Sequence, residues 1–276
     1  QHGPLRLIFT VDEETNMTGA LSLSADHVKD AKYVINCDSE SIHVICVASA
    51  GSCHMEFTRD LHRCAPKGDT ALTVRAHALA GGHSGEVINE GRGNAIKAVA
   101  DVLYRLSEGG VEYALADYKG GVAANAIPSD ASAVVVVAAK DVDRVKATVV
   151  AAEKDFNLVY GETDPNAVFE VTPAALPKSV LSAEDTTSIV DVINLLHCGV
   201  FAMDRRLPRL PALSASLGTI ETREDVLAFQ YFPRSSSDAR LQAMVRVMPI
   251  MAKCTGTKVH IEKPFPAWTE SKNSKL

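Results

Sequence analysis

The sequence predicts an α/β segment at the N-terminal end, followed by a two-layer α+β region. A short apolar run, Leu5–Val11, is typical of a strand buried on both faces, and it leads directly into three acids. From Thr70 onward, segments with strand and helix periodicity follow in the order strand, helix, strand, strand, helix. That order is expected for a helix layer packed on a sheet, so we predict a mixed fold with two kinds of region.

The first region should contain several strands and one short helix. The expected strands are Leu5–Val11, Lys32–Asp38, His43–Ala50 and Cys53–Arg59, and the helix lies near Met17–Leu23. Two of the strands end in acids, and sites in open α/β sheets form at the carboxyl ends of strands. Acids from two strand ends can therefore share one cation. The alternative is that residues 12–14 cap a helix, whose dipole favours acids.

The second region should alternate strands with amphipathic helices. Residues 157–178 carry three prolines and are expected to form a loop, as are residues 205–211. Pro249 should kink or end the last helix. The later elements again read helix, hairpin, helix, strand, although no close sequence repeat is visible. The expected strands are 70–80, 111–118, 131–139, 216–221, 226–232 and 258–263, and the expected helices are 92–107, 141–156, 182–198 and 237–251.

Composition narrows the classes of function. The net charge of -6 over 276 residues makes nucleic acid an improbable partner, and no apolar run approaches the ~18 residues of a membrane span. Six cysteines at irregular spacing, with no Cys-x-x-Cys pair, favour reduced thiols in a cytoplasmic protein. The chain begins with Gln1 and enters an apolar strand within a few residues, so we expect a fragment or a processed chain.

A series of short motifs resembles one enzyme family over nearly the whole chain. The motifs, in order, are Thr10–Ala20, Ile35–Glu40, Gly81–Gly85, Gly93–Ala95, Gly120–Gly121, Asn125–Pro128, Arg234–Ser236 and Pro266–Trp268. Their order and spacing resemble the M20 metallopeptidases, and within them the aminoacyl-histidine (Xaa-His) dipeptidases of the PepD type. The resemblance implies part of a zinc-peptidase-like catalytic α/β domain with an inserted two-layer α+β lid domain. Residues 1–67 and 264–276 would be catalytic, and residues 68–263 would form the lid and dimerisation domain.

The resemblance also implies roles for single residues. In this family two metal ions, usually Zn²⁺ with Co²⁺ or Mn²⁺ as alternatives, activate a water that attacks the peptide carbonyl. Glu13 matches the general base, and Glu14 and Asp38 match metal ligands. The lid residues implied are His83 at the oxyanion, Asn125 near the substrate and Arg234 on the free carboxylate of a dipeptide. Without the resemblance, His83 would be read as an ordinary surface or core histidine, and Arg234 equally well as a solvated loop arginine or as a carboxylate clamp.

Departures from the family pattern are equally clear. No earlier His-x-Asp, no bridging Asp and no late His are present, so Glu14 and Asp38 leave each ion one protein ligand. Catalytic zinc usually takes three protein ligands, so we expect no tight zinc binding and no dipeptidase activity from residues 1–276 alone. We expect the complete protein to be a cytoplasmic, homodimeric dipeptidase. The alternatives are another M20 amidohydrolase such as a deacylase, or a non-catalytic M20-like remnant that dimerises or binds peptides.

Overall fold

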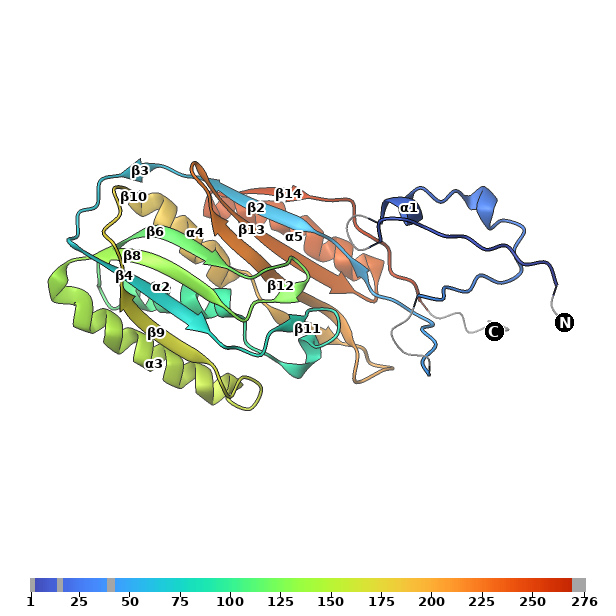
Figure 1. The fold of residues 1–276 in the computed structure, drawn as a ribbon, viewed down its shortest axis with the longest axis horizontal. Helices are drawn as coiled ribbons and strands as arrows, with labels where there is room; N and C mark the ends of the chain where they lie inside the picture. The colour runs from blue at the N-terminus through green and yellow to red at the C-terminus, as the bar shows by residue number, and fades with distance from the viewer. Residues whose placement is uncertain (1–2, 14–16, 39–42, 270–276) are drawn as a thin grey trace. The chain divides into compact units, whose positions relative to one another are not determined.

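The structure is a computed structural model that describes residues 3–13, 17–38 and 43–269 (Figure 1). The chain divides into two compact parts, one of residues 1–47 with 271–276 and the other of residues 48–270. The division into catalytic residues 1–67 and 264–276 and lid residues 68–263 stays a prediction. The first part contains the predicted short helix, α1 (Thr18–Leu21), and a 3-10 turn, η1 (Ala25–His27).

The second part holds the remaining elements. Its helices are α2 (Ala95–Glu108), α3 (Val142–Tyr160), α4 (Ala183–Leu195) and α5 (Asp238–Thr255), with 3-10 turns η2 (Ile88–Glu90) and η3 (Ala139–Asp141). Its longer strands are β2 (Met55–Asp60), β4 (Thr70–His77), β6 (Tyr113–Gly120), β8 (Ala131–Val137), β9 (Val168–Pro173), β11 (Gly199–Met203), β12 (Pro211–Thr222), β13 (Val226–Ser235) and β14 (Lys258–Ile261). Its two-residue strands are β1 (Gly51–Ser52), β3 (Arg63–Cys64), β5 (Gly82–His83), β7 (Ala126–Ile127) and β10 (Val180–Leu181).

Three strands predicted near the N-terminus are wrong. No named strand is formed by residues 5–11, 32–38 or 43–50. Within the last range, Ser49 makes only an isolated bridge to Trp268. A strand exists only where a neighbour pairs with its backbone, and the described part of the chain supplies none for residues 5–11. Their apolar side chains are accordingly uncovered: Phe9 is 88% exposed.

The second part is built on one large antiparallel sheet with helices on one face (Figure 1). Its main path runs β14-β2-β13-β12-β6-β8-β4-β9. Side chains alternate along each strand, so Phe229 and Tyr231 of β13 point into the core under the helices. Phe57 of β2 stacks on Phe229 with ring centroids 5.0 Å apart. The alternate residues of β13, including Phe232 and Arg234, therefore lie on the opposite, open face.

This sheet consists of two halves of the same design. The first half, β4-α2-β6-β8-α3-β9, and the second half, β2-α4-β12-β13-α5-β14, share the order strand, helix, strand, strand, helix, strand. From the outer edge inward the strands run β9-β4-β8-β6 in one half and β14-β2-β13-β12 in the other. The halves meet where β6 pairs antiparallel with β12. The two halves are thus arranged like the two subunits of a two-fold symmetric dimer, but both belong to one chain.

The seam between the halves requires glycine at two places. Gly121 has φ +73°, and a Cβ added there would overlap the carbonyl oxygen of Gly218. A Cβ added at Gly218 would in turn overlap the carbonyl oxygen of Ala124. Asn94, the N-cap of α2, donates its side-chain N–H to the Leu217 carbonyl at 2.9 Å across the seam. The short β6–β12 pairing thus depends on close backbone contact and on one buried amide.

Two predictions for the chain beyond residue 156 are corrected by packing. Residues 168–173, expected within a loop, form the edge strand β9 beside β4, because an edge position tolerates the terminal Pro173. Helix α5 continues through Pro249 to Thr255, so of the two effects expected of that proline, ending the helix is wrong. Met248 and Ala252 of α5 are buried in the core, and this burial offsets the roughly 3 kcal/mol that an interior proline costs. The sequence predicted no strand at Gly199–Met203, but these residues form β11, which pairs with β12.

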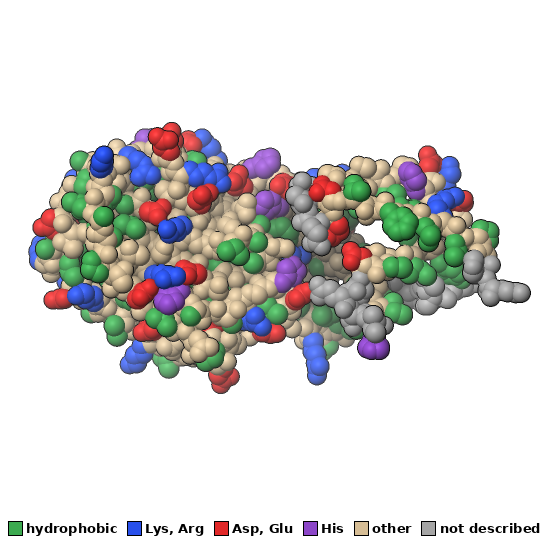
Figure 2. Space-filling view, in the orientation of Figure 1, with side chains coloured by type: hydrophobic (Ala, Val, Ile, Leu, Met, Phe, Trp, Pro, Cys, Tyr) green, Lys and Arg blue, Asp and Glu red, His purple; other side chains and the backbone are tan. Residues whose placement is uncertain are grey.

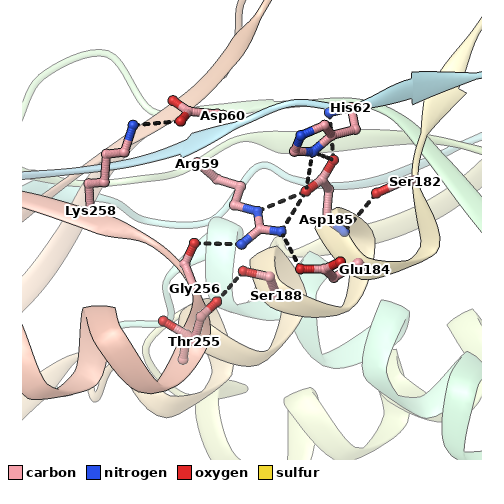
Figure 3. Close-up of polar contacts among 10 residues, drawn as sticks. All are labelled: Arg59, Asp60, His62, Ser182, Glu184, Asp185, Ser188, Thr255, Gly256 and Lys258. Carbon is pink, nitrogen blue, oxygen red and sulfur yellow. Dashed lines mark hydrogen bonds and ion pairs between the residues drawn. The ribbon is translucent and has the colours of Figure 1, made fainter.

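A buried ion pair ties β2 to α4, elements more than 120 residues apart in sequence (Figure 3). Arg59 donates Nε–H to Asp185 Oδ1 at 2.8 Å and Nη1–H to the Gly256 carbonyl at 2.5 Å. The other Asp185 oxygen accepts from the His62 backbone N–H at 2.6 Å. Asp185 is fully buried, while Glu184, which also contacts Arg59, is 86% exposed. Asp185 therefore contributes more than Glu184 to the stability of this link between β2 and α4.

We predict that Asp185→Asn lowers the free energy of unfolding by about 3–5 kcal/mol, because it leaves Arg59 buried without its counter-charge. The matched control is Glu184→Gln, which should change the free energy by about 1 kcal/mol or less, since exposed pairs contribute little. Urea unfolding at pH 7 measures both. Similar effects of the two substitutions would contradict the assignment.

The same carboxylate should make stability depend on pH. Burial raises the pKa of Asp185, but hydrogen bonds from the His62 N–H, Arg59 and Ser182 together lower this pKa below its ordinary value. A carboxyl with a lowered folded-state pKa stabilises the fold above its unfolded pKa of about 3.9, and that stabilisation is lost as the pH falls through the folded value. Between pH 7 and pH 3, wild type should lose more stability than Asp185→Asn.

Candidate functional site

The loop that carries His83 is shaped by its glycines. Gly81 and Gly82, with φ of +60° and +122°, turn the chain out of β4. The two-residue strand β5 then pairs with β7, placing Gly82 opposite Ile127 and His83 opposite Ala126. Two motifs that lie 40 residues apart in the sequence thus form one small ribbon. His83 is partly exposed at its edge, with Nδ1 3.9 Å from Glu86 Oε1.

Asp164 fixes both ends of this loop. Its carboxylate is buried and accepts hydrogen bonds from the Ala80 N–H and the Gly93 N–H, each at 2.8 Å. Arg92 adds a third tie, donating Nη1–H to the Gly81 carbonyl at 2.5 Å. The loop can therefore present His83 on a backbone held at its start and its end.

Arg234 lies on the open face of the sheet, between Ser52 of β1 and Ser214 of β12. Its guanidinium carbon lies 4.7 Å from the centroid of the Phe232 ring. Burial lowers the pKa of Arg234. Its Nε is buried without a hydrogen-bond partner among the described residues. A desolvated guanidinium that forms no ion pair with a carboxylate of the described residues is prepared to bind an anion.

His83 and Arg234 meet at Gly85. A Cβ added to Gly85 would lie 2.9 Å from His83 Cε1 and 3.2 Å from Arg234 Cζ. His83 lies in the small β5–β7 ribbon, between β4 and α2 in sequence, and Arg234 lies on β13 of the large sheet, so a single chain brings them together. The pair offers an imidazole and a guanidinium to one small volume, which suits a substrate with two oxygen-bearing groups close together.

Asn125 contributes by its backbone in this structure. Its carbonyl accepts a hydrogen bond from the Ser84 N–H at 2.8 Å, which ties the His83 loop to the segment before β7. The Asn125 side chain is exposed at the turn. Its expected place near the substrate stays a prediction.

The acidic residues of the first part are not gathered into a site. Glu13 and Asp38 are exposed, and Glu14 lies outside the described residues. Asp12, one of the three acids that follow Leu5–Val11, accepts a hydrogen bond from Thr18 Oγ1 at 2.8 Å. Among residues 3–13, 17–38 and 43–269, no group of three or more His, Cys, Asp and Glu side chains could hold a metal ion. The described residues alone do not fit a two-metal centre.

Several functional candidates were missed by sequence reasoning. Asp164 and Arg92 hold the His83 loop, and Phe232 lies against Arg234. No local signal marks them, because their partners lie far away in the sequence. Only the placement of Phe232 and Arg234 at positions i and i+2 of a strand could have been predicted from the sequence.

A hollow of about 800 Å³ opens on the sheet beside β5 and β7. It is lined in part by Gly82, Lys119 and Arg223, but neither His83 nor Arg234 lines it.

Known proteins are similar to this chain over nearly its whole length. Residues 76–164 match the peptidase dimerisation domain of M20 proteins. Cytosol non-specific dipeptidase of Escherichia coli (strain K12) is 29% identical over 99% of this chain and 56% of its own length. The crystal structure of aminoacylhistidine dipeptidase from Vibrio alginolyticus matches 96% of this chain and 54% of that one, with a TM-score of 0.86 and 26% identity. The chain thus spans about half the length of these relatives.

We predict that Asp164→Asn loosens the His83 loop, because an amide cannot accept both backbone N–H groups as the carboxylate does. Losing a buried hydrogen bond to a charged group costs about 1.5–3 kcal/mol, so amide hydrogen exchange in residues 81–93 should accelerate roughly tenfold or more. Asp143→Asn, at a side chain that is 97% exposed, is the matched control. Equal exchange in the two variants would show that Asp164 does not hold the loop.

Proposed function

We propose, for a chain that is related to the M20 dipeptidases over 99% of its length, that the natural protein hydrolyses dipeptides of the Xaa-His type. Relation to that group is what the motifs predicted. The Xaa-His preference is suggested by the aminoacylhistidine dipeptidase that this chain resembles. Residues 68–263, the predicted lid domain, would then recognise the substrate.

The meeting of His83 and Arg234 at Gly85 carries the proposal. In a dipeptide the carbon of the scissile carbonyl and the carbon of the free carboxylate are only three bonds apart. The groups that bind them must therefore be close neighbours. His83 is suited to donate to the oxyanion that develops on the carbonyl, and Arg234 to grip the carboxylate. A longer peptide would place its carboxylate beyond this pair.

The first part would supply the acids of the reaction. By the M20 motif, Glu13 is the general base, and Glu14 and Asp38 are ligands of Zn²⁺, with Co²⁺ or Mn²⁺ as alternatives. The metal would lower the pKa of a bound water to near neutrality. Two ligands fall short of the three protein groups that catalytic zinc usually takes. The metal centre therefore needs side chains that the described residues do not bring together.

The expected partners follow from surface and topology. We propose a cytoplasmic homodimer, since residues 76–164 match a peptidase dimerisation domain and the Escherichia coli relative is named as a cytosolic dipeptidase. The β6 edge is already paired with β12, so a second copy has to dock elsewhere. Figure 2 shows Lys and Arg interspersed with Asp and Glu across the visible face, an arrangement that gives nucleic acid no basic stripe there. No helix within the described ranges has the length and apolarity to cross a bilayer.

Two alternatives remain in view. An N-acyl amino acid also carries its scissile carbonyl three bonds from a free carboxylate, so an M20 deacylase would use the same pair. A non-catalytic M20-like remnant that dimerises or binds peptides would keep Arg234 and lack turnover. Assay of the natural protein, with zinc, on Xaa-His dipeptides and on N-acetyl amino acids separates the three.

We predict that Arg234→Ala raises the KM for an Xaa-His dipeptide about 100-fold, the cost of losing charge-assisted hydrogen bonds of roughly 1.5–3 kcal/mol. The amidated dipeptide, which lacks the carboxylate charge, should be nearly insensitive to the substitution. Arg234→Lys is the matched variant and should recover only part of the affinity, since Lys cannot bind bidentately. Equal sensitivity of acid and amide would refute the carboxylate contact.

For His83 the expected effect is on turnover. His83→Ala should lower kcat by about 10²–10³ while changing KM little, because the proposed contact strengthens only in the transition state. His260, an exposed histidine on β14, provides the matched control, and His260→Ala should leave both constants close to wild type. A change in KM without a change in kcat would reassign His83 to ground-state binding.

A further inference from the structure

Three buried polar side-chain atoms lack a hydrogen-bond partner among the described residues: His54 Nε2, Ser84 Oγ and Arg234 Nε. A buried polar atom without a partner destabilises the fold, and native interiors rarely leave one without a reason. Ser84 precedes Gly85, whose added Cβ would lie 3.2 Å from the Arg234 guanidinium carbon. Ser84 is thus the sequence neighbour of a residue that lies against Arg234.

The strand register places His54 on the same face as Arg234. Met55 pairs with Tyr231, and the Cys53 N–H donates to the Pro233 carbonyl at 3.1 Å, so His54 lies opposite Phe232. Cys53 and Met55 are buried in the core. Since side chains alternate along a strand, His54 projects to the open face, where Phe232 and Arg234 lie.

The orientation of the His54 ring is set by Glu262. Nδ1 lies 2.7 Å from Glu262 Oε1, and the Glu262 N–H donates to the His54 carbonyl at 3.0 Å. A carboxylate that holds one ring nitrogen fixes the ring and leaves the other nitrogen for a ligand. That other nitrogen is Nε2, the atom without a partner.

Phe232 is a neighbour of both the His54 imidazole and the Arg234 guanidinium. Its ring centroid is 6.0 Å from the centroid of the His54 ring and 4.7 Å from Arg234 Cζ. An aromatic ring in this place excludes water from both side chains and gives an apolar wall to the bound molecule. The Phe232 ring thus has the His54 imidazole, with Glu262 bound to its Nδ1, and the Arg234 guanidinium as neighbours.

We propose that His54 is a second binding residue for the free carboxylate of the dipeptide, with Nε2–H donating to one carboxylate oxygen while Arg234 holds the other. The inference rests on the proposed function and deepens it. Arg234, Ser84 and the protonated imidazole are all able to donate, so the pocket fits an anion with two oxygens. Glu262 supplies the counter-charge for the imidazole. A dipeptide with a blocked carboxylate cannot satisfy these donors, and specificity for the free acid follows.

The test compares two amides at position 54. In His54→Gln the side-chain N–H₂ reaches the region of Nε2, while in His54→Asn it reaches only the region of Nδ1 and keeps the contact with Glu262. Calorimetric titration of residues 1–276 with alanyl-histidine should give a Kd about tenfold weaker for His54→Asn and within about threefold of wild type for His54→Gln. The Kd of the alanyl-histidine amide should be the same for all three proteins.

A measurement on wild type covers the case in which a variant does not fold. The ¹⁵N resonance of His54 Nε2 should shift on titration with alanyl-histidine and stay in place on titration with its amide. Equal weakening by Asn and Gln, equal effects on acid and amide, an unmoved Nε2 signal or no saturable binding would each overturn the inference.

Failure of this inference can be told from failure of the proposed function. If Arg234→Ala abolishes discrimination between acid and amide while His54→Asn retains it, His54 has only a structural part and the proposed function stands. If discrimination survives both substitutions, the carboxylate contact of Arg234 falls as well.

Discussion

The close backbone contact between Gly121 and Gly218 is the constraint on which the second part of the chain depends. It brings β6 and β12 near enough to pair over only a few residues, because neither position tolerates a Cβ. Asn94 reinforces the contact by capping α2 and donating to the Leu217 carbonyl. Lys97 extends the tie through the helix layer, where its ammonium donates to the carbonyls of Ile193 and Asn194 at the end of α4.

The seam decides what the candidate site can contain. His83 lies in the loop that follows β4 of the first half, and Arg234 lies on β13 of the second half. Pairing β6 with β12 joins the halves, and Gly85 then fits between the two side chains. In an assembly of separate chains such a pair would depend on association; here a covalent link fixes their effective concentration. The loop that carries His83 can contain little regular secondary structure because Asp164 binds both of its ends.

Two arginines on the sheet show how environment separates structure from function. Arg59 points to the helix side and donates to Asp185, Glu184 and the Gly256 carbonyl, so its charge is fully compensated. Arg234 is also shielded from water, but it has a phenyl ring in place of a carboxylate, and its Nε has no partner among the described residues. An uncompensated cation costs folding free energy, and this cost is explained if a substrate anion supplies the missing charge.

The sequence by itself determined the order of most helices and strands from Cys53 onward and the resemblance to M20 dipeptidases, since periodicity and short motifs are local properties. The choice of His83 and Arg234 came from the same motifs, and their roles stay predictions. It failed where a partner decides the outcome. Leu5–Val11 has the composition of a buried strand, yet no described segment pairs with it; Val168–Pro173 looked like a loop and became a strand because β4 offered its edge. Only the tertiary structure joined the two halves at Gly121 and brought His54 into register with Phe232. Contacts between residues 100 or more apart depend on pairing and burial, and no local pattern records them.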